Sequence, residues 1–197
     1  MKKSIASAAV ALAMAGGAAH AVEVRGVVGG GFTFGGDTLA TVRYENNDYG
    51  ADEAKVHAGG LIAFNAGIEL RFTDLVSGQV LVGYHFDRAN GDNGNVRFER
   101  FPIEFLGHFK LTEWFRVGGG LRYTNKATLR ASGAGNYFAT DEDFKPSYGG
   151  VVEGEFFPLQ SFGIKVRYVS EKFKSKTFPQ LPEADGSHGG VYFNYYF

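Results

Sequence analysis

The sequence predicts an all-β fold: an eight-stranded antiparallel up-and-down transmembrane β-barrel. Three observations predict it. Apolar side chains recur at every second position, eight such stretches follow one another, and the connections between them alternate between short and long. Helical periodicity is not evident after the first 21 residues. The composition agrees, because the chain has 29 glycines, 19 phenylalanines and 10 tyrosines, and aromatic residues are enriched in strands.

Each of the eight stretches sets an apolar face against a more polar one. In the first, Val24 and Phe32 alternate with Arg25 and Thr33. A side-chain period of two is the signature of a strand with two different faces. We expect strands at residues 22–35, 56–72, 78–88, 96–110, 115–130, 147–157, 162–174 and 188–197.

The connections between these strands alternate regularly in length. Residues 73–77, 111–114 and 158–161 are tight turns. The other connections are longer polar loops with Gly, Asn, Asp and Pro, as is typical of irregular segments. We place them at about 36–55, 89–95, 131–146 and 175–187. Short turns at one end and long loops at the other are typical of an up-and-down meander and of outer-membrane barrels.

The N-terminus predicts export. Lys2 and Lys3 precede a short apolar stretch, and Ala19-His20-Ala21 fits a signal-peptidase site. We therefore expect a cleaved signal peptide at 1–21 and one barrel domain at 22–197. Removing the two lysines leaves 20 − 2 = 18 basic against 21 acidic side chains, a net charge of −3, which argues against nucleic acid as a partner. With no cysteine, the exported fold has no disulfides.

Period two alone leaves open which face points outward. A soluble lipocalin-like barrel turns its apolar face inward, whereas a membrane barrel turns it toward lipid. Three observations favour the membrane barrel: the apolar faces are long enough to span, charges of both signs lie in mid-strand, and aromatic residues gather beside the short turns. We expect these aromatics at the membrane interface: Phe72, Trp114, Phe115, Phe157 and Phe162.

The polar faces would then line the barrel interior. An eight-stranded barrel is just wide enough to be filled by side chains, and buried charges must pair. The sequence thus predicts a charged interior network and a poor conductor rather than an open pore. Its members are Arg25, Glu69, Arg71, His85, Glu104, His108, Arg116, Arg122, Glu153, Glu155, Lys165 and Arg167.

Two glycine triplets fall inside predicted strands, at 29–31 and 118–120. Glycine weakens a flat strand, but it accommodates the curvature of a narrow barrel. A nucleotide-binding loop would require a helix directly after the triplet, and neither triplet is followed by a helical pattern. We interpret both as barrel features.

The signal "MKKSIASAAVALAMAGGAAHA", the segment "FPIEFLGHFKLTEWFRVGGGLRY" and the terminal "GGVYFNYYF" carry a resemblance. Together they resemble the eight-stranded outer-membrane β-barrel proteins of Gram-negative bacteria, of the OmpA/OmpX/Ail type. The resemblance implies outer-membrane lipid and the barrel-assembly machinery as partners. It also implies that Gly190, Phe193, Tyr195 and Phe197 form the C-terminal signal that this machinery reads.

We expect no catalytic residue, cofactor or metal. His85 and Asp87 share one face, yet no nucleophile is placed beside them in sequence, and the histidine contexts lack the His-x-Ser pair of a lipid A deacylase barrel. The oxygen-rich stretches at 90–95 and 140–143 lack EF-hand spacing and are interpreted as solvated loops.

The favoured hypothesis is a monomeric structural or surface-interaction barrel, with recognition of any host or surface ligand through its long loops. Two alternatives stay open. One is a lipid-modifying enzyme in the same fold, and the other is a soluble exported barrel that binds a small apolar ligand.

Overall fold

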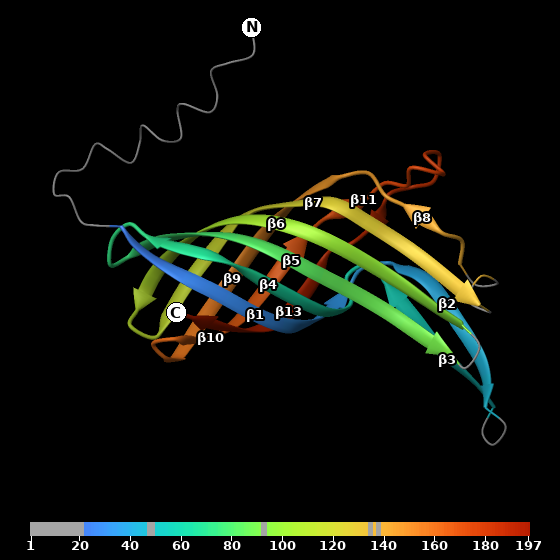
Figure 1. Ribbon diagram of the computed structural model, residues 1–197, viewed down its shortest axis with the longest axis horizontal. Helices are drawn as coiled ribbons and strands as arrows, with labels where there is room; N and C mark the ends of the chain where they lie inside the picture. The colour runs from blue at the N-terminus through green and yellow to red at the C-terminus, as the bar shows by residue number, and fades with distance from the viewer. Residues whose placement is uncertain (1–21, 47–49, 92–93, 134–135, 137–138) are drawn as a thin grey trace, which may run out of the picture.

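A computed structural model describes residues 22–46, 50–91, 94–133, 136 and 139–197. The predicted signal peptide at 1–21 lies outside these residues. No helix in the described part of the chain has the length and apolarity that a membrane crossing requires. Eight long strands dominate the structure (Figure 1). They are β1 (Glu23–Gly35), β4 (Leu61–Arg71), β5 (Val76–Gly91), β6 (Gly94–Thr112), β7 (Phe115–Gly133), β9 (Ser147–Leu159), β10 (Phe162–Ser170) and β13 (His188–Tyr196).

These strands form a closed antiparallel barrel, which confirms the predicted fold. Each pairs with its neighbours in the order β1-β4-β5-β6-β7-β9-β10-β13, and β13 returns to β1. At the closing seam, Val28 faces Tyr195 on one side and Ala66 of β4 on the other. Around the described part of the barrel wall, every strand has a partner on both sides, so its backbone hydrogen bonds can be satisfied without water.

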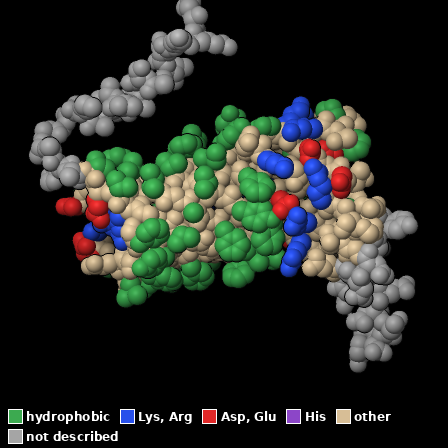
Figure 2. All heavy atoms as spheres, in the orientation of Figure 1, with side chains coloured by type: hydrophobic (Ala, Val, Ile, Leu, Met, Phe, Trp, Pro, Cys, Tyr) green, Lys and Arg blue, Asp and Glu red, His purple; other side chains and the backbone are tan. Residues whose placement is uncertain are grey.

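The barrel has an apolar outside and a polar inside. Phe32 is 63% exposed and Leu121 is 69% exposed, whereas Glu69 and Glu155 are fully buried. Figure 2 shows apolar side chains spread across the middle of the face in view. This arrangement suits lipid and inverts that of a water-soluble barrel, so the lipocalin-like alternative is wrong.

The strand ends differ from the prediction mainly at the long-loop end. The strand expected at 56–72 begins at Leu61. The strands expected at 78–88, 96–110 and 115–130 are longer, and most of the loop expected at 89–95 belongs to β5, which reaches Gly91, and to β6, which begins at Gly94. The strands continue because their alternation persists beyond the membrane. At the other end the turns are tighter than expected; Thr73 Oγ1 accepts the N–H groups of Leu75 and Val76 in the first of them.

The predicted long loops contain further strands. β2 (Thr38–Asn46) and β3 (Gly50–His57) form a hairpin in the loop expected at 36–55, and β3 includes residues 56–57, which were expected in the next strand. β8 (Glu142–Asp143) extends the sheet beside β7. β11 (Lys172–Phe173) pairs with β12 (Ala184–Asp185). We call this end of the molecule, with the outer parts of β5–β7, the head.

An apolar plug closes the interior within the head. It is formed by side chains that continue the inward faces of the barrel strands, by residues of β2, β3 and β11, and by the residues that directly follow β3 and β8. Phe98 lies at its centre, with its ring centroid 5.5 Å from those of both Phe144 and Phe173. The plug comprises Ala40, Val42, Val56, Ala58, Ala89, Val96, Phe98, Ala127, Leu129, Phe144 and Phe173.

Candidate functional site

The structure places ten of the twelve predicted network residues inside the barrel with at most 6% of their surface exposed. The other two, Arg25 and Arg71, lie at the turn end, with 15% and 42% of their side chains exposed. The inward-facing side chains form three groups along the barrel axis, beneath the plug.

The group nearest the turns is centred on Arg116. Its guanidinium lies 2.6 Å from Glu69 Oε2 and 2.7 Å from Glu155 Oε2, and it also donates to the Tyr196 hydroxyl. Arg116 and Glu155 occupy directly opposite positions on β7 and β9, and opposite charges at such positions stabilise a sheet. Arg71 contacts the far side of Glu69 at 3.3 Å.

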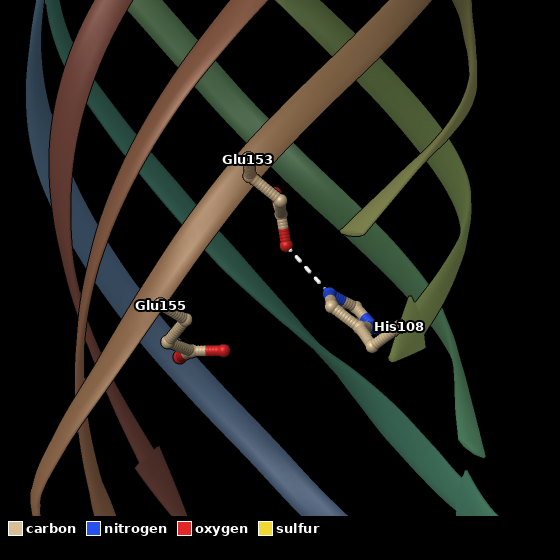
Figure 3. Close-up of side chains that lie close together, drawn as sticks. All are labelled: His108, Glu153 and Glu155. Atoms are coloured by element: carbon tan, nitrogen blue, oxygen red, sulfur yellow. Dashed lines mark hydrogen bonds and ion pairs between the residues drawn. The ribbon is translucent and has the colours of Figure 1, made fainter. Parts of the chain in front are cut away.

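The middle group is centred on Glu153. Its Oε1 accepts from His108 Nε2 and Lys165 Nζ, each at 2.7 Å, and its other oxygen accepts from Arg167. Figure 3 shows the His108–Glu153 bond, with Glu155 on the same strand. Oxygen and nitrogen atoms of His108, Glu153 and Glu155 lie within 4.8 Å of one another, close enough to ligate a metal.

The donor set nevertheless fits ion pairing better than metal binding. Each carboxylate already faces basic side chains: Lys165 and Arg167 contact Glu153, and Arg116 contacts Glu155. A cation would have to displace these ammonium and guanidinium groups and would sit beside their charges. We therefore assign the three residues to the interior network.

The third group lies closest to the plug. Glu104 pairs with Arg167 at 3.0 Å and with Arg122 at 2.9 Å, and Arg122 Nε lies 3.2 Å from Glu171. Glu104 and Arg122 are opposite each other on β6 and β7. Sequence analysis left Glu171 out of the network, although it continues the polar face of Lys165 and Arg167.

Arg100 is a further interior charge that the sequence analysis missed. It is fully buried, and it donates through Nη2 to the Gly60 carbonyl oxygen at 3.0 Å and to His85 Nε2 at 2.8 Å. Its guanidinium lies over the rings of Phe98 and Phe173. The signal was present: Arg100 precedes Glu104 by an even number of residues, so both share one face.

The histidine and aspartate on β5 do not form the pair that was considered as a general base. Asp87 accepts the backbone N–H of His57 at 2.8 Å, while His85 Nε2 lies 2.7 Å from the Thr33 hydroxyl. A hydroxyl therefore does lie beside His85, contrary to expectation. Both side chains are buried beneath the plug, and the Arg100 guanidinium donates to the same nitrogen, which occupies the lone pair that a base would need.

The predicted interfacial aromatics divide into two sets. Phe72 and Trp114 are exposed at the turn end, and Phe162 is half-buried beside Phe193. The prediction for Phe157 is wrong, because its ring packs on Tyr196 and the Arg116 guanidinium inside the barrel mouth. Phe156 faces outward, so the next residue must face inward. Phe115 lines the rim of the same mouth.

This mouth is an open vestibule of about 570 Å³ at the turn end. Arg25, Arg71, Lys110 and Glu113 are among the side chains that line it, and Arg116 also borders it. Since Arg116 belongs to the first charged group, the vestibule leads directly into the ion-paired interior.

The residues of the proposed assembly signal lie on both faces of β13 and directly after its end. Phe193, Tyr195 and Phe197 point outward and are exposed, whereas Gly190 faces inward against Thr33 and Tyr192. Phe197 also completes the seam, since its N–H and carbonyl oxygen both bond to the backbone of Gly26.

Topology and side-chain orientation together define the class: this protein is an integral eight-stranded β-barrel of the outer membrane. Solved structures of that class are similar to this chain. Ail of Yersinia pestis, solved with the heparin analogue sucrose octasulfate, superposes with a TM-score of 0.50 at 16% identity, over 89% of this chain and 99% of Ail. Neisserial surface protein A has a TM-score of 0.47 and 8% identity, over 90% of this chain and 100% of that protein. OprG of Pseudomonas aeruginosa has a TM-score of 0.43 and 13% identity, over 89% of this chain and 97% of OprG. No protein-family profile and no curated protein sequence matches the chain.

Proposed function

We propose that this protein is a non-conducting, non-enzymatic barrel that presents its head for interactions at the cell surface. One observation carries the proposal: the chain fills its own interior with ion pairs, closes it with an apolar plug, and folds the long loops into strands. A diffusion pore would require a continuous polar, water-filled lumen. Here charged groups are linked to one another across the lumen, and the plug covers them.

The chemistry of the interior supports a non-enzymatic role. The Thr33 hydroxyl and His85 resemble a nucleophile and its base in distance alone. They lie beneath the plug, where a lipid substrate in the surrounding membrane does not reach them. Arg100 also donates a hydrogen bond to His85 Nε2. The vestibule does open to the aqueous phase, but its lining carries charged and aromatic side chains without a nucleophile–base pair among the described residues.

The head supports a surface role because it is built from paired strands around its own core rather than from irregular loops. Such a scaffold holds outward side chains in fixed positions, which recognition requires. The Ail structure, solved with a heparin analogue, is an example of a barrel of this class that takes a ligand.

Planar-bilayer recording tests the closed interior. We expect the refolded protein to show no steady conductance, because ions would have to break buried ion pairs to pass. A variant that replaces Phe98, Phe144 and Phe173 by Ala removes the centre of the plug. Conductance of this variant would show that the plug blocks the path, and its absence would show that the ion-pair network does. A large, steady conductance of the unmodified protein would contradict the proposal.

A further inference from the structure

The outward side of the head carries a concentration of basic side chains that the net charge of the chain conceals. They come from β5, β6 and β7 and from the segments that directly follow β8 and β11. Figure 2 shows Lys and Arg side chains gathered at this end, directly beside the apolar side chains. We call this set the basic face: Arg88, Arg97, Lys126, Arg130, Lys145, Lys174 and Lys176.

Three arginines of the basic face lie in one row across the sheet. Arg88 is directly opposite Arg97, and Arg97 is directly opposite Arg130. Like charges at opposite positions destabilise a sheet. Glu99 contacts Arg97 at 3.1 Å and Asp143 contacts Arg130, which offsets part of the repulsion. Arg88 has no such carboxylate partner among the described residues.

Three lysines form a second row. β7 keeps one register with β8 and β9, which places Lys126 opposite Lys145. The N–H of Lys145 donates to the Lys174 carbonyl oxygen at 2.8 Å, so the third lysine follows on the next segment. All three side chains are exposed, and none forms an ion pair with a carboxylate of the described residues.

The pKa of the Asp143 carboxyl group indicates a positive local electrostatic potential. This residue lies in β8, in the head and outside the membrane-spanning part of the barrel. A hydrogen bond from Arg130, together with the charges of Arg130, Lys176 and Lys126, lowers its pKa below the ordinary value. The seven cations of the basic face outnumber the four acids beside them, Glu99, Asp141, Glu142 and Asp143, and leave an excess of positive charge.

The lysine row lies at the level of the membrane interface. Lys126 is directly opposite Phe101, which is outward-facing, and the Phe101 ring lies 5.1 Å from that of Tyr84. On the other side of β7, Tyr123 and Tyr148 pack at 5.0 Å. Aromatic belts of this kind mark the headgroup level of a bilayer. Flexible lysine chains at this depth lie beside lipid headgroups rather than far out in solvent.

We propose that the basic face binds the phosphate groups of anionic lipid headgroups in the outer leaflet, with the lysine row as the main contact. Charge complementarity and the level of the row favour a membrane lipid over a soluble polyanion. Bound phosphates would offset the repulsion within both rows. The inference goes beyond the surface role proposed above, because it depends only on the basic face and on the barrel spanning the membrane.

The test compares two variants of equal net charge in the full-length folded protein. Lys126→Gln/Lys145→Gln removes two members of the lysine row. Lys55→Gln/Lys110→Gln removes two surface lysines outside the basic face, one on β3 and one at the turn end. Each protein in detergent micelles is titrated with diphosphoryl lipid A, and bound lipid is counted by native mass spectrometry. Because each cation near an anionic surface contributes about 1 kcal/mol, we expect the loss of two lysines to weaken binding by the row variant roughly 30-fold, and the control to bind like the unmodified protein.

Two further arms distinguish the source of the anion. Dephosphorylated lipid A should bind the unmodified protein no better than it binds the row variant. Sucrose octasulfate, a soluble polyanion, should bind the unmodified protein more weakly than lipid A does. Equal lipid A binding by both variants, or a preference for the soluble polyanion, would overturn the proposal. A heat-dependent shift in gel mobility establishes that each variant is folded.

Discussion

At the scale of single residues, the interior depends on charges with several partners at once. Arg116 joins Glu69 of β4, Glu155 of β9 and the Tyr196 hydroxyl of β13. A pair of charges buried without such sharing gains little over apolar packing. A guanidinium shared between two carboxylates uses several of its N–H donors at once. It thereby connects β4, β9 and β13 across the lumen.

Arg116→Met should therefore destabilise the barrel strongly, because Glu69 and Glu155 would remain buried without their main cation. Breaking a buried pair from one side costs about 3–5 kcal/mol. Urea unfolding in lipid vesicles would measure this change in free energy. Adding Glu69→Gln to the variant removes one of the unpaired charges and should restore part of the stability. A double variant no more stable than Arg116→Met would contradict this account of the network.

At the scale of elements, β6 and β7 each run through two environments, the membrane span and the head. β6 and β7 carry polar residues inward within the membrane span and then turn Phe98, Ala127 and Leu129 inward in the head. The same inward face is thus ion-paired where it is surrounded by lipid and apolar where the surrounding loops can cover it. This explains why the loops fold into strands: β2, β3, β11 and the segment after β8 supply the other half of a core.

Phe98→Ala should loosen the head and leave the membrane-spanning barrel intact. Truncating a buried phenylalanine costs about 3–5 kcal/mol, and the Phe98 ring packs edge-on against the rings of Phe144 and Phe173. Hydrogen exchange should accelerate at β8 and β11 while the amides of β1 and β13 stay protected. Phe105→Ala makes the same chemical change on the lipid-facing side of β6 and is the matched control. Faster exchange throughout the barrel would show that the head is not a separate unit of stability.

At the scale of the whole molecule, one seam between the two ends of the chain closes the barrel. β1 and β13 pair from Val27–Tyr196 to Gly35–His188, and Phe197 extends the seam by two backbone hydrogen bonds to Gly26. Its ring covers Gly26 so closely that a Cβ there would meet it at 2.4 Å. The terminal residue therefore has a structural position in addition to its expected role in assembly.

Phe197→Ala should lower the amount of folded protein in the outer membrane, because it removes both the ring over the seam and the expected recognition residue. The measurement is the heat-shifted band in outer-membrane fractions of cells that express the protein at equal levels. Phe34→Ala removes an exposed ring on β1 at the opposite end of the seam and is the control. Equal amounts for both variants would show that Phe197 does not guide assembly.

Much of this architecture was predictable, because the alternation of apolar and polar side chains can be seen directly in the sequence. It assigns Glu153 and Glu155 to one face and Val152 and Phe156 to the other, whatever the neighbours are. Arg100 and Phe157 follow the same rule: Arg100 shares the inward face of Glu104 in mid-strand, and Phe157 follows the outward-facing Phe156 at the strand end. The plug was harder to predict, because Val42 and Phe144 lie in stretches whose turn residues resemble irregular loops.

By itself, then, the sequence determined the eight membrane strands, their inverted faces and the set of charges that must lie inside, because these depend on local alternation and on the cost of charge in lipid. Only the tertiary structure decided which charges meet. Register brings Arg116 to Glu155, aligns Arg88, Arg97 and Arg130 in a row, and joins segments far apart in the chain into a plug. Register depends on hydrogen bonding between strands around the whole closed barrel, and no single stretch of residues contains that information.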